Sequence, residues 1–407
     1  MSTIAPWFSL PAPPVLGNIA VIGAGLAGCH IAYELAQRGH PVTLVDAANE
    51  VAGAASGNNA GIVKPFVTRS PSTIDAFYQA GFNHLTALLR SNPSLSFAAN
   101  FKQCGVLQLL ERAYPDNDVY QFCTAKQASD IAGTRIDSEA IFFPDAGWLN
   151  PAALCRALAN HERITTRLRF SVERLCRAHE QWQIVALDGE QLDCHTLILA
   201  NGHRLNQFEQ TAFLPIVAAR GQTSRCQVPA GCQLNTVVSG KRYAIPEGST
   251  ISVGASYSPG NENSHESEAD HLSNLQGIDT VLPAIAPTLK PYSGFCAVRA
   301  TTPDRLPLLG PVPDNNAYES DYALLKNGLP WKRFSAARYQ TNLYVIGGFG
   351  SRGIVTAALA AQLLATHLCT GSHSHSESGT LDTWHSQCHP ARFLVRTIKR
   401  AGSDVAR

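Results

Sequence analysis

An α/β fold, in which an antiparallel sheet is inserted into a domain built on a parallel sheet, is predicted by three features of this 407-residue sequence. A short β-branched segment, a glycine turn, an amphipathic helix and a second apolar segment follow one another within residues 18–46. Between residues 215 and 300, short apolar segments alternate with turns, as in an antiparallel sheet. Residues 340–369 return to a buried strand, a glycine loop and a helix, which complete the parallel part.

The glycine turn in the first of these segments has the features of a Rossmann-like dinucleotide-binding site. Gly23 permits the tight turn, Gly25 lets the backbone approach a pyrophosphate, and Gly28 lets the helix pack close to the sheet. The helix N-terminus offers unpaired N–H groups to negative charge. Asp46 ends the second strand, where an acid hydrogen-bonds a ribose hydroxyl. A strand–turn–helix unit without a ligand is the alternative, which the full pattern disfavours. The predicted contacts are Gly23, Gly25, Leu26, Ala27, Gly28 and Asp46.

A run of small residues follows this unit at positions 53–61. Small side chains let the backbone pass a flat, bulky ring system. In glutathione-reductase-like and D-amino-acid-oxidase-like flavoproteins, a loop that resembles this one runs along the pyrophosphate and ribityl chain of FAD. The run therefore favours FAD over NAD, and a surface loop without a ligand is the alternative. The predicted contacts are Ala55, Ser56, Gly57, Asn58 and Gly61.

Three later segments are predicted to reach the same site. The apolar strand Thr196–Ala200 ends at a small-residue corner, and strands of this kind end at the ligand crevice. A glycine-rich loop at residues 347–353 precedes the last long helix, Ile354–Cys369. Val172 either presents its backbone to the adenine, as in flavoproteins of this type, or packs in the core. The predicted contacts are Val172, Asn201, Gly202, Gly350, Ser351, Arg352, Gly353 and Ile354.

Periodicity and turn signals predict most of the remaining elements. Helices are expected at 74–89, followed by Pro93 as a helix terminator, from Asn150-Pro151, at 266–278 and at 354–369. Strands are expected at 101–110, 169–175, 182–186, 196–200, 216–226, 236–245, 251–257, 295–300 and 340–347. The expected domains are a linker-like N-terminus at 1–17, FAD-binding parts at 18–100, 151–213 and 301–369, substrate-domain parts at 101–150 and 214–300, a flexible linker at 370–380 and a basic C-terminal helix at 381–407.

The composition is that of an ordinary globular enzyme. Hydrophobic residues make up 45% of the chain, and the formal net charge is +1, so no overall basic excess indicates nucleic acid. The eleven cysteines contain no Cys-x-x-Cys pair and indicate reduced thiols. We see no signal peptide and no apolar run of ~18 residues that would span a bilayer, and we expect a soluble, cytoplasmic protein. His373 and His375 lack a third ligand nearby, so a linker is favoured over a metal site.

Several blocks of the sequence carry a family resemblance over almost the whole chain. They are residues 55–58, 104–108, 147–151, 220–222, 253–256, 270–274, 299–307, 349–353 and 389–393. With these blocks the sequence resembles the D-amino-acid-oxidase-like FAD proteins, and more narrowly the oxidoreductase domain of the MnmC family of tRNA 5-methylaminomethyl-2-thiouridine biosynthesis proteins. The family carries a methyltransferase domain before this part, which the residues ahead of the first strand do not provide. Lys64 also stands where the family has another residue.

The resemblance implies an FAD-dependent oxidoreductase that acts on a CH–NH group. Its substrate would be the 5-carboxymethylaminomethyl-(2-thio)uridine of tRNA, converted to 5-aminomethyl-(2-thio)uridine and glyoxylate without a methyl-transfer step, so a separate methyltransferase is a possible partner. FAD would be bound non-covalently, because Cys296 is out of register with the cysteine that covalent relatives use. A small-molecule amine or amino-acid oxidase of glycine-oxidase type and a flavin-binding scaffold without turnover are the alternatives.

Two arginines are the predicted catalytic residues, and a basic tail is the predicted tRNA contact. The resemblance suggests that Arg299 binds the substrate carboxylate; pairing with Asp304 to brace a turn is the alternative. Arg352 is expected near the isoalloxazine ring, and a structural role at helix-end carbonyls is its alternative. The tail would place Arg392, Arg396, Lys399 and Arg400 on one charged helix face. A solvated helix whose cations favour its own dipole would explain the same pattern.

Overall fold

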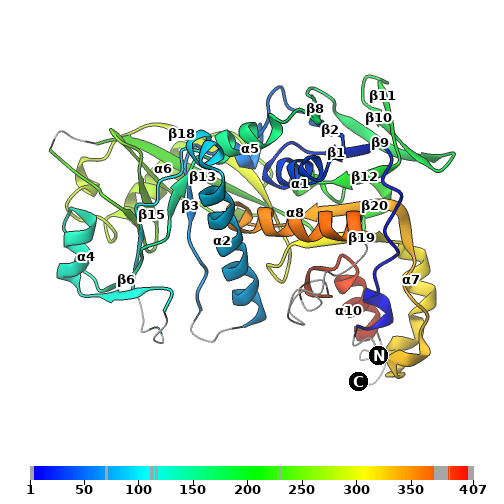
Figure 1. Cartoon of the computed structure of the whole chain (residues 1–407). Coiled ribbons are helices and arrows are strands. Elements are labelled where there is room, and N and C mark those ends of the chain that lie inside the picture. The colour runs from blue at the N-terminus through cyan, green and yellow to red at the C-terminus, as the bar shows by residue number, and fades with distance from the viewer. Residues whose placement is uncertain are drawn as a thin grey trace.

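The computed structural model describes residues 4–68, 72–110, 114, 118–228, 231–370, 384 and 386–401. Two large sheets dominate this part of the chain, with long helices between and around them (Figure 1). The first sheet is largely parallel and contains the N-terminal glycine unit, whereas the second is largely antiparallel. The predicted α/β fold with an antiparallel insertion is therefore confirmed.

The parallel sheet positions the glycine turn at the carboxyl end of its central strand. Its strands in spatial order are β19 (Leu308–Pro313), β20 (Tyr339–Gly347), β12 (Thr196–Leu199), β1 (Ile19–Ile22), β2 (Val42–Val45) and β8 (Ile164–Arg167). All pair in parallel except β19, which is antiparallel to β20 at one edge. Every residue of β1 and β12 is buried, as expected of a parallel sheet that is covered on both faces.

One face of this sheet is covered by packed helices, and a small sheet covers the other. The helices are α1 (Leu26–Gln37), α2 (Thr73–Ser91), α5 (Pro151–Ala159) and α8 (Gly353–Thr370), with α1 and α2 both packed on α8 (Figure 1). The small sheet contains β9 (Val172–Ala178), β10 (Gln181–Ala186) and β11 (Gln191–Cys194), and its Trp182 is buried against the parallel strands. The helical face holds the largest hydrophobic core.

Helix α8 has the length and the mean hydropathy, 1.5, of a membrane-spanning segment. However, 67% of its residues are buried inside the protein, and it lies between α1 and α2. An apolar helix that is largely buried by its own chain is typical of a protein core. No other helix in the described ranges has this combination of length and hydropathy.

The antiparallel sheet forms the other half of the molecule, at the left of Figure 1. Its strands in order are β17 (Ser258–Pro259), β13 (Val217–Gln227), β16 (Thr250–Gly254), β15 (Tyr243–Pro246), β14 (Val237–Ser239), β4 (Val106–Leu109), β6 (Ala140–Phe143) and β5 (Gln121–Cys123), while β18 (Pro291–Thr301) pairs with β13. Helices α4 (Ala125–Ala132) and α6 (Glu268–Ile278) enclose its separate hydrophobic core. The remaining elements are β3 (Gly61–Val63), β7 (Gly147–Leu149), α3 (Pro93–Ala98), α7 (Asn315–Asp321) and α10 (Arg392–Arg400).

Three sequence predictions about these elements need correction. The strand expected at 101–110 is only Val106–Leu109, because Gly105 adopts a φ of +76° just before it. The strand expected at 236–245 is two strands, separated by a turn that Gly240 N–H closes on Arg242 O. Pro93 ends α2 but also begins α3, since proline fits the first turn of a helix. The strands expected at 169–175 and 182–186 correspond to β9 and β10 of the small antiparallel sheet.

The C-terminal helix α10 is present. Its first arginine, which was expected on an exposed charged face, is buried instead. Arg392 is 2% exposed and donates to both carboxylate oxygens of Asp304 at 2.9 Å, and to Leu306 O at 2.8 Å. Arg396 joins the same carboxylate at 2.7 Å. Because Asp304 binds these two side chains, it is not the partner of Arg299. The predicted linker at 370–380 falls almost wholly outside the described residues, as do His373 and His375.

The N-terminal segment predicted as a linker packs on this helix. Trp7 is 6% exposed and shares a hydrophobic cluster with Tyr318 of α7 and Val395 of α10. The Tyr318 hydroxyl donates to Trp7 O at 2.9 Å, and the Lys399 ammonium lies 4.9 Å from the centre of the Trp7 ring. The two ends of the described chain therefore meet beside α7 (Figure 1).

Arg392→Met should lower the melting temperature, because it leaves a largely buried carboxylate with one of its two partners missing. Removing one member of such a pair typically costs about 3–5 kcal/mol. Burial alone would raise the pKa of Asp304, but the hydrogen bonds and charges of Arg392 and Arg396 outweigh it and hold this pKa below its ordinary value. The stabilisation is thus present at neutral pH and is lost as pH falls through the lowered pKa. Thermal melts at pH 7 and pH 3 should show a larger deficit at pH 7; an equal deficit would contradict this assignment.

Candidate functional site

The first βαβ unit has the geometry that its glycines predict. Gly23 adopts a φ of +107° and donates its N–H to Val45 O at 2.7 Å, which extends the pairing of β1 with β2 to the start of the turn. A Cβ atom at Gly28 would overlap Gly23 O, so only glycine allows α1 to start this close to the strand. The turn and the N-terminus of α1 together form a site where the backbone is free to approach a phosphate.

Asp46 lies at the carboxyl end of β2, on the same side as this turn. Its Oδ2 accepts the Ala24 N–H at 2.6 Å, and its Oδ1 accepts the Ala48 N–H at 2.8 Å. These bonds fix the carboxylate while leaving each oxygen further lone pairs. The carboxylate is therefore held in place at the edge of a cavity, where it can still accept a hydrogen bond from a hydroxyl.

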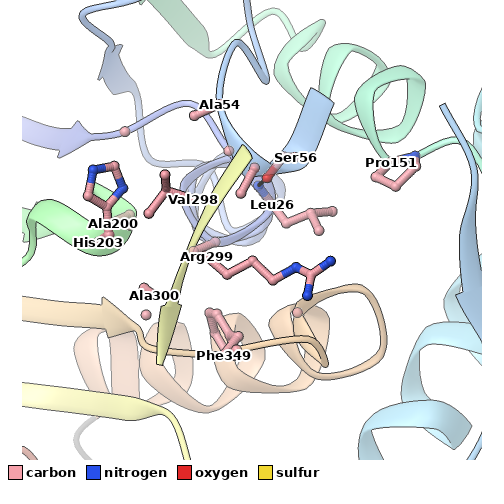
Figure 2. Close-up of a pocket in the computed structure, with 18 of the residues that line it drawn as sticks. Leu26, Ala54, Ser56, Pro151, Ala200, His203, Val298, Arg299, Ala300 and Phe349 are labelled. Atoms are coloured by element: carbon pink, nitrogen blue, oxygen red, sulfur yellow. Dashed lines mark hydrogen bonds between the residues drawn. The ribbon is translucent and has the colours of Figure 1, made fainter. Parts of the chain in front are cut away.

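The small-residue loop lies against the N-terminus of α1. The Ser56 hydroxyl accepts the Leu26 N–H at 2.9 Å, and a Cβ atom at Gly25 would come within 2.9 Å of the same oxygen. Asn58 Nδ2 donates to Ala60 O at 2.6 Å and shapes the rest of the loop. Figure 2 shows Ser56 and Leu26 side by side at this point. The loop and the helix end thus form one continuous wall.

This wall belongs to a cavity of about 870 Å³ that extends between the two large sheets. Apart from two glycines, every residue predicted for the site lines it. These residues are Gly23, Gly25, Leu26, Ala27, Asp46, Ala55, Ser56, Asn58, Gly61, Val172, Asn201, Gly202, Arg299, Gly350, Ser351, Arg352, Gly353 and Ile354. Segments that are distant in the sequence therefore meet around one cavity (Figure 2).

The two exceptions, Gly28 and Gly57, lie behind the wall. Gly28 packs on the turn as described above, and a Cβ atom at Gly57 would come within 2.8 Å of Ala52 O. Both glycines shape the backbone of the cavity and do not face it. Val172 lines the cavity and also packs against the core beneath the small sheet.

Arg299 lies on β18, which crosses the cavity between the glycine unit and the loop before α8 (Figure 2). Its Nη1 donates to Ser351 Oγ at 3.3 Å, and a Cβ atom at Gly221 on the paired strand would come within 2.8 Å of Nη2. Among the described residues no carboxylate forms an ion pair with this guanidinium. The side chain is therefore placed by its neighbours and can bind an anion.

Arg352 lies in the loop before α8, packed on aromatic rings. Its guanidinium is 4.3 Å from the ring centre of Phe66 and 5.9 Å from that of Tyr78. Burial lowers the pKa of Arg352, and the Tyr78 hydroxyl opposes this effect. The Arg352 side chain contacts aromatic rings. Its alternative role, hydrogen bonding to helix-end carbonyls, has no support among the described residues.

Sequence reasoning missed several residues of the cavity wall, chiefly Lys64 and Tyr243. Lys64 follows β3 and donates to Gln108 Oε1 at 2.7 Å. Burial raises the pKa of Tyr243, and the charge of Arg299 opposes this increase. For Lys64, the only signal in the sequence was a lysine after the glycine loop, where the family has another residue. Tyr243 carried none, because β15 brings it to the cavity through long-range strand pairing.

The charges on the wall fit a dinucleotide and a further anion. Asp46 is the only carboxylate among the described residues that line the cavity. The cationic side chains on the same wall are those of Lys64, Arg204, Arg299 and Arg352. The diphosphate of FAD carries negative charge and would lie at the glycine turn, where Gly23 and Gly25 allow the approach. The size, the glycine turn and the charge of the site are all consistent with FAD.

The family model for "FAD dependent oxidoreductase" matches residues 18–367, which include every wall segment described above. The chain belongs to this FAD-dependent oxidoreductase family. It is therefore an oxidoreductase that uses FAD, as the resemblance predicted. The match begins at the first strand of the parallel sheet and ends within α8.

Curated relatives match nearly the full length of this chain. The tRNA 5-methylaminomethyl-2-thiouridine biosynthesis bifunctional protein MnmC of Ectopseudomonas mendocina is 33% identical over 419 residues, which cover 97% of this chain and 62% of the relative. The protein of the same name from Chromohalobacter salexigens is 33% identical over 434 residues, covering 98% and 59%. The chain thus spans less than two thirds of the length of these relatives.

Solved structures share the fold of the oxidoreductase at low sequence identity. L-Proline dehydrogenase from P. horikoshii gives a TM-score of 0.71 at 18% identity and covers 94% of this chain and 98% of its own. Glycine oxidase from Geobacillus kaustophilus gives 0.69 at 19% identity, covering 86% and 94%. These matches support the same arrangement of a parallel and an antiparallel sheet.

Proposed function

We propose that the chain oxidises a secondary amine in tRNA. The substrate is the 5-carboxymethylaminomethyl-(2-thio)uridine of the wobble position, and the products are 5-aminomethyl-(2-thio)uridine and glyoxylate. The observation that carries the proposal is the likeness to the MnmC proteins across 97% of this chain. A cytoplasmic location follows from a tRNA substrate.

The residues of the cavity suit this reaction. Bound FAD supplies a two-electron acceptor for the hydride of the methylene between amine and carboxylate. Arg299 binds the carboxylate and so fixes the adjacent methylene, which is the positioning that such a reaction needs. Hydrolysis of the resulting imine then releases glyoxylate.

We further propose that FAD is held without a covalent bond. None of the described residues that line the cavity is a cysteine. Cys296 lies on β18, where its sulfur is 3.9 Å from Asn263 O, and it does not line the cavity. A methyl-transfer step is not part of the proposed reaction, so a separate methyltransferase would have to act on the product.

Glyoxylate release tests this function. Purified protein should release glyoxylate from bulk tRNA of a bacterial strain that lacks the bifunctional enzyme, in an amount that matches the loss of the carboxymethyl group measured by nucleoside mass spectrometry. Glycine and sarcosine should give much slower release. Release from glycine or sarcosine but not from tRNA would instead identify a small-molecule oxidase of glycine-oxidase type.

A further inference from the structure

Lys64 is a further cationic side chain on the cavity wall, in addition to Arg204, Arg299 and Arg352. It is half-buried and follows β3, which begins at the end of the small-residue loop. Its Nζ donates to Gln108 Oε1 at 2.7 Å and to Pro65 O at 3.4 Å. Gln108 is itself anchored, since its Nε2 donates to the Tyr114 hydroxyl at 3.2 Å. The amine is therefore held in place by defined neighbours.

The surroundings of Lys64 disfavour its positive charge. Burial lowers the pKa of Lys64 to about 7, and the charge of Arg352 adds to the effect. The groups packed around Lys64 and Arg352 are the ring of Phe143, whose centre lies 5.0 Å from Nζ, the rings of Phe66 and Tyr78, and the hydroxyl of Tyr114. No carboxylate of the described ranges lies within ion-pair distance of Nζ. The amine can consequently lose its proton near neutral pH.

The hydrogen bonds leave a neutral Lys64 with its lone pair unused. A neutral primary amine has two N–H donors and one lone pair, and Gln108 and Pro65 provide one acceptor for each donor. The lone pair is then available to a proton donor that enters the cavity. A lysine that is buried beside another cation is a familiar way to obtain a base at neutral pH.

We propose that Lys64 is the catalytic base that takes the proton from the ammonium group of the substrate. This inference rests on the proposed function, in which a secondary amine must lose a hydride from its neighbouring methylene. A protonated amine has no lone pair to stabilise the positive charge that develops there, so it must first become neutral. One N–H bond of the substrate breaks, one N–H bond forms on Lys64, and no electrons are transferred in this step. Arg352 acts as a positioning residue that keeps Lys64 neutral until the substrate arrives.

An NMR titration tests the inference without turnover. The chain has eight lysines, so ε-carbon labelling of lysine in the FAD-bound protein gives few signals, and Lys64→Arg identifies the one from Lys64. The Lys64 signal should titrate near pH 7, and in Arg352→Met its midpoint should move upward because a repelling charge is removed. A midpoint above pH 9 in the wild-type protein would overturn the proposal.

Kinetics on the tRNA substrate provide the second measurement. Lys64→Met should keep FAD absorbance and melting temperature, but lose roughly 100- to 10,000-fold in kcat/KM at pH 7, the usual contribution of a general base. Its activity should recover with rising pH as the substrate amine loses its own proton. Lys64→Arg should behave in the same way, because arginine stays protonated. Lys126→Met, the same change at an exposed position of α4, is the matched control and should match the wild type.

Two outcomes would contradict the role of Lys64. A raised KM with an unshifted pH profile in Lys64→Met would mean that the lysine binds the carboxylate as a cation. An unchanged kcat/KM would remove it from the reaction altogether. If the wild-type protein releases no glyoxylate from tRNA at any pH, the proposed function fails instead, and the NMR midpoint still decides whether Lys64 is a base at neutral pH.

Discussion

Gly25→Val should give a folded but colourless protein. Gly25 has φ −87° and ψ −170°, an extended conformation that valine adopts readily, so the backbone is not strained by the change. The new side chain would instead fill the space in front of Ser56 Oγ, which lies 2.9 Å from the position of the Cβ atom. That space is where the diphosphate of FAD must approach the helix N-terminus. The ratio of flavin absorbance to protein absorbance measures the effect.

The same variant should also lose its thermal response to FAD. A ligand present at 100 times its Kd stabilises a protein by about 2.7 kcal/mol, so added FAD should raise the melting temperature of the wild type and not that of Gly25→Val. Gly25→Ala, with a smaller side chain, should show an intermediate response. Full flavin occupancy in the valine variant would place the diphosphate elsewhere.

Arg299→Gln should lower kcat/KM by roughly ten- to a few-hundredfold, with normal FAD content and melting temperature. A guanidinium binds a carboxylate through two parallel hydrogen bonds, and charge-assisted bonds of this kind contribute on the order of 1.5–3 kcal/mol each. Because this contact also fixes the methylene that is oxidised, kcat should fall together with affinity. Arg299→Lys should recover only part of the loss, because an ammonium is a point charge.

The structure supplies a matched control for this prediction. Arg225, on the neighbouring strand β13, pairs with Glu247 at 3.2 Å and does not line the cavity. Arg225→Gln should therefore lower the melting temperature slightly and leave turnover unchanged. Since Asp304 is bound by Arg392 and Arg396, a bracing role of Arg299 toward that acid has no structural support. Wild-type kinetics of Arg299→Gln on the modified tRNA would show that another group binds the carboxylate.

Residues whose roles are local could be predicted from the sequence. The glycine turn, the helix after it and Asp46 lie within one βαβ unit, where strand, turn and helix signals are set by neighbouring residues. The helix expected from Asn150-Pro151 begins there, and the Asn150 side chain accepts the Ala153 N–H at 2.9 Å. For the same reason, the loop at 53–61 could be placed beside the cofactor site before any long-range contact was known.

Contacts between distant segments depended on the three-dimensional packing. Lys64 meets Arg352 only because β3 and the loop before α8 are brought to the same end of the cavity. The ion pair of Asp304 with Arg392 buries the first arginine of a helix whose charge pattern predicts an exposed basic face. Charge and periodicity describe one segment at a time, whereas burial and pKa depend on which side chains the fold places beside it. The candidate base of this oxidoreductase is therefore a property of its packing, while the glycine unit for its cofactor was already evident in the order of its residues.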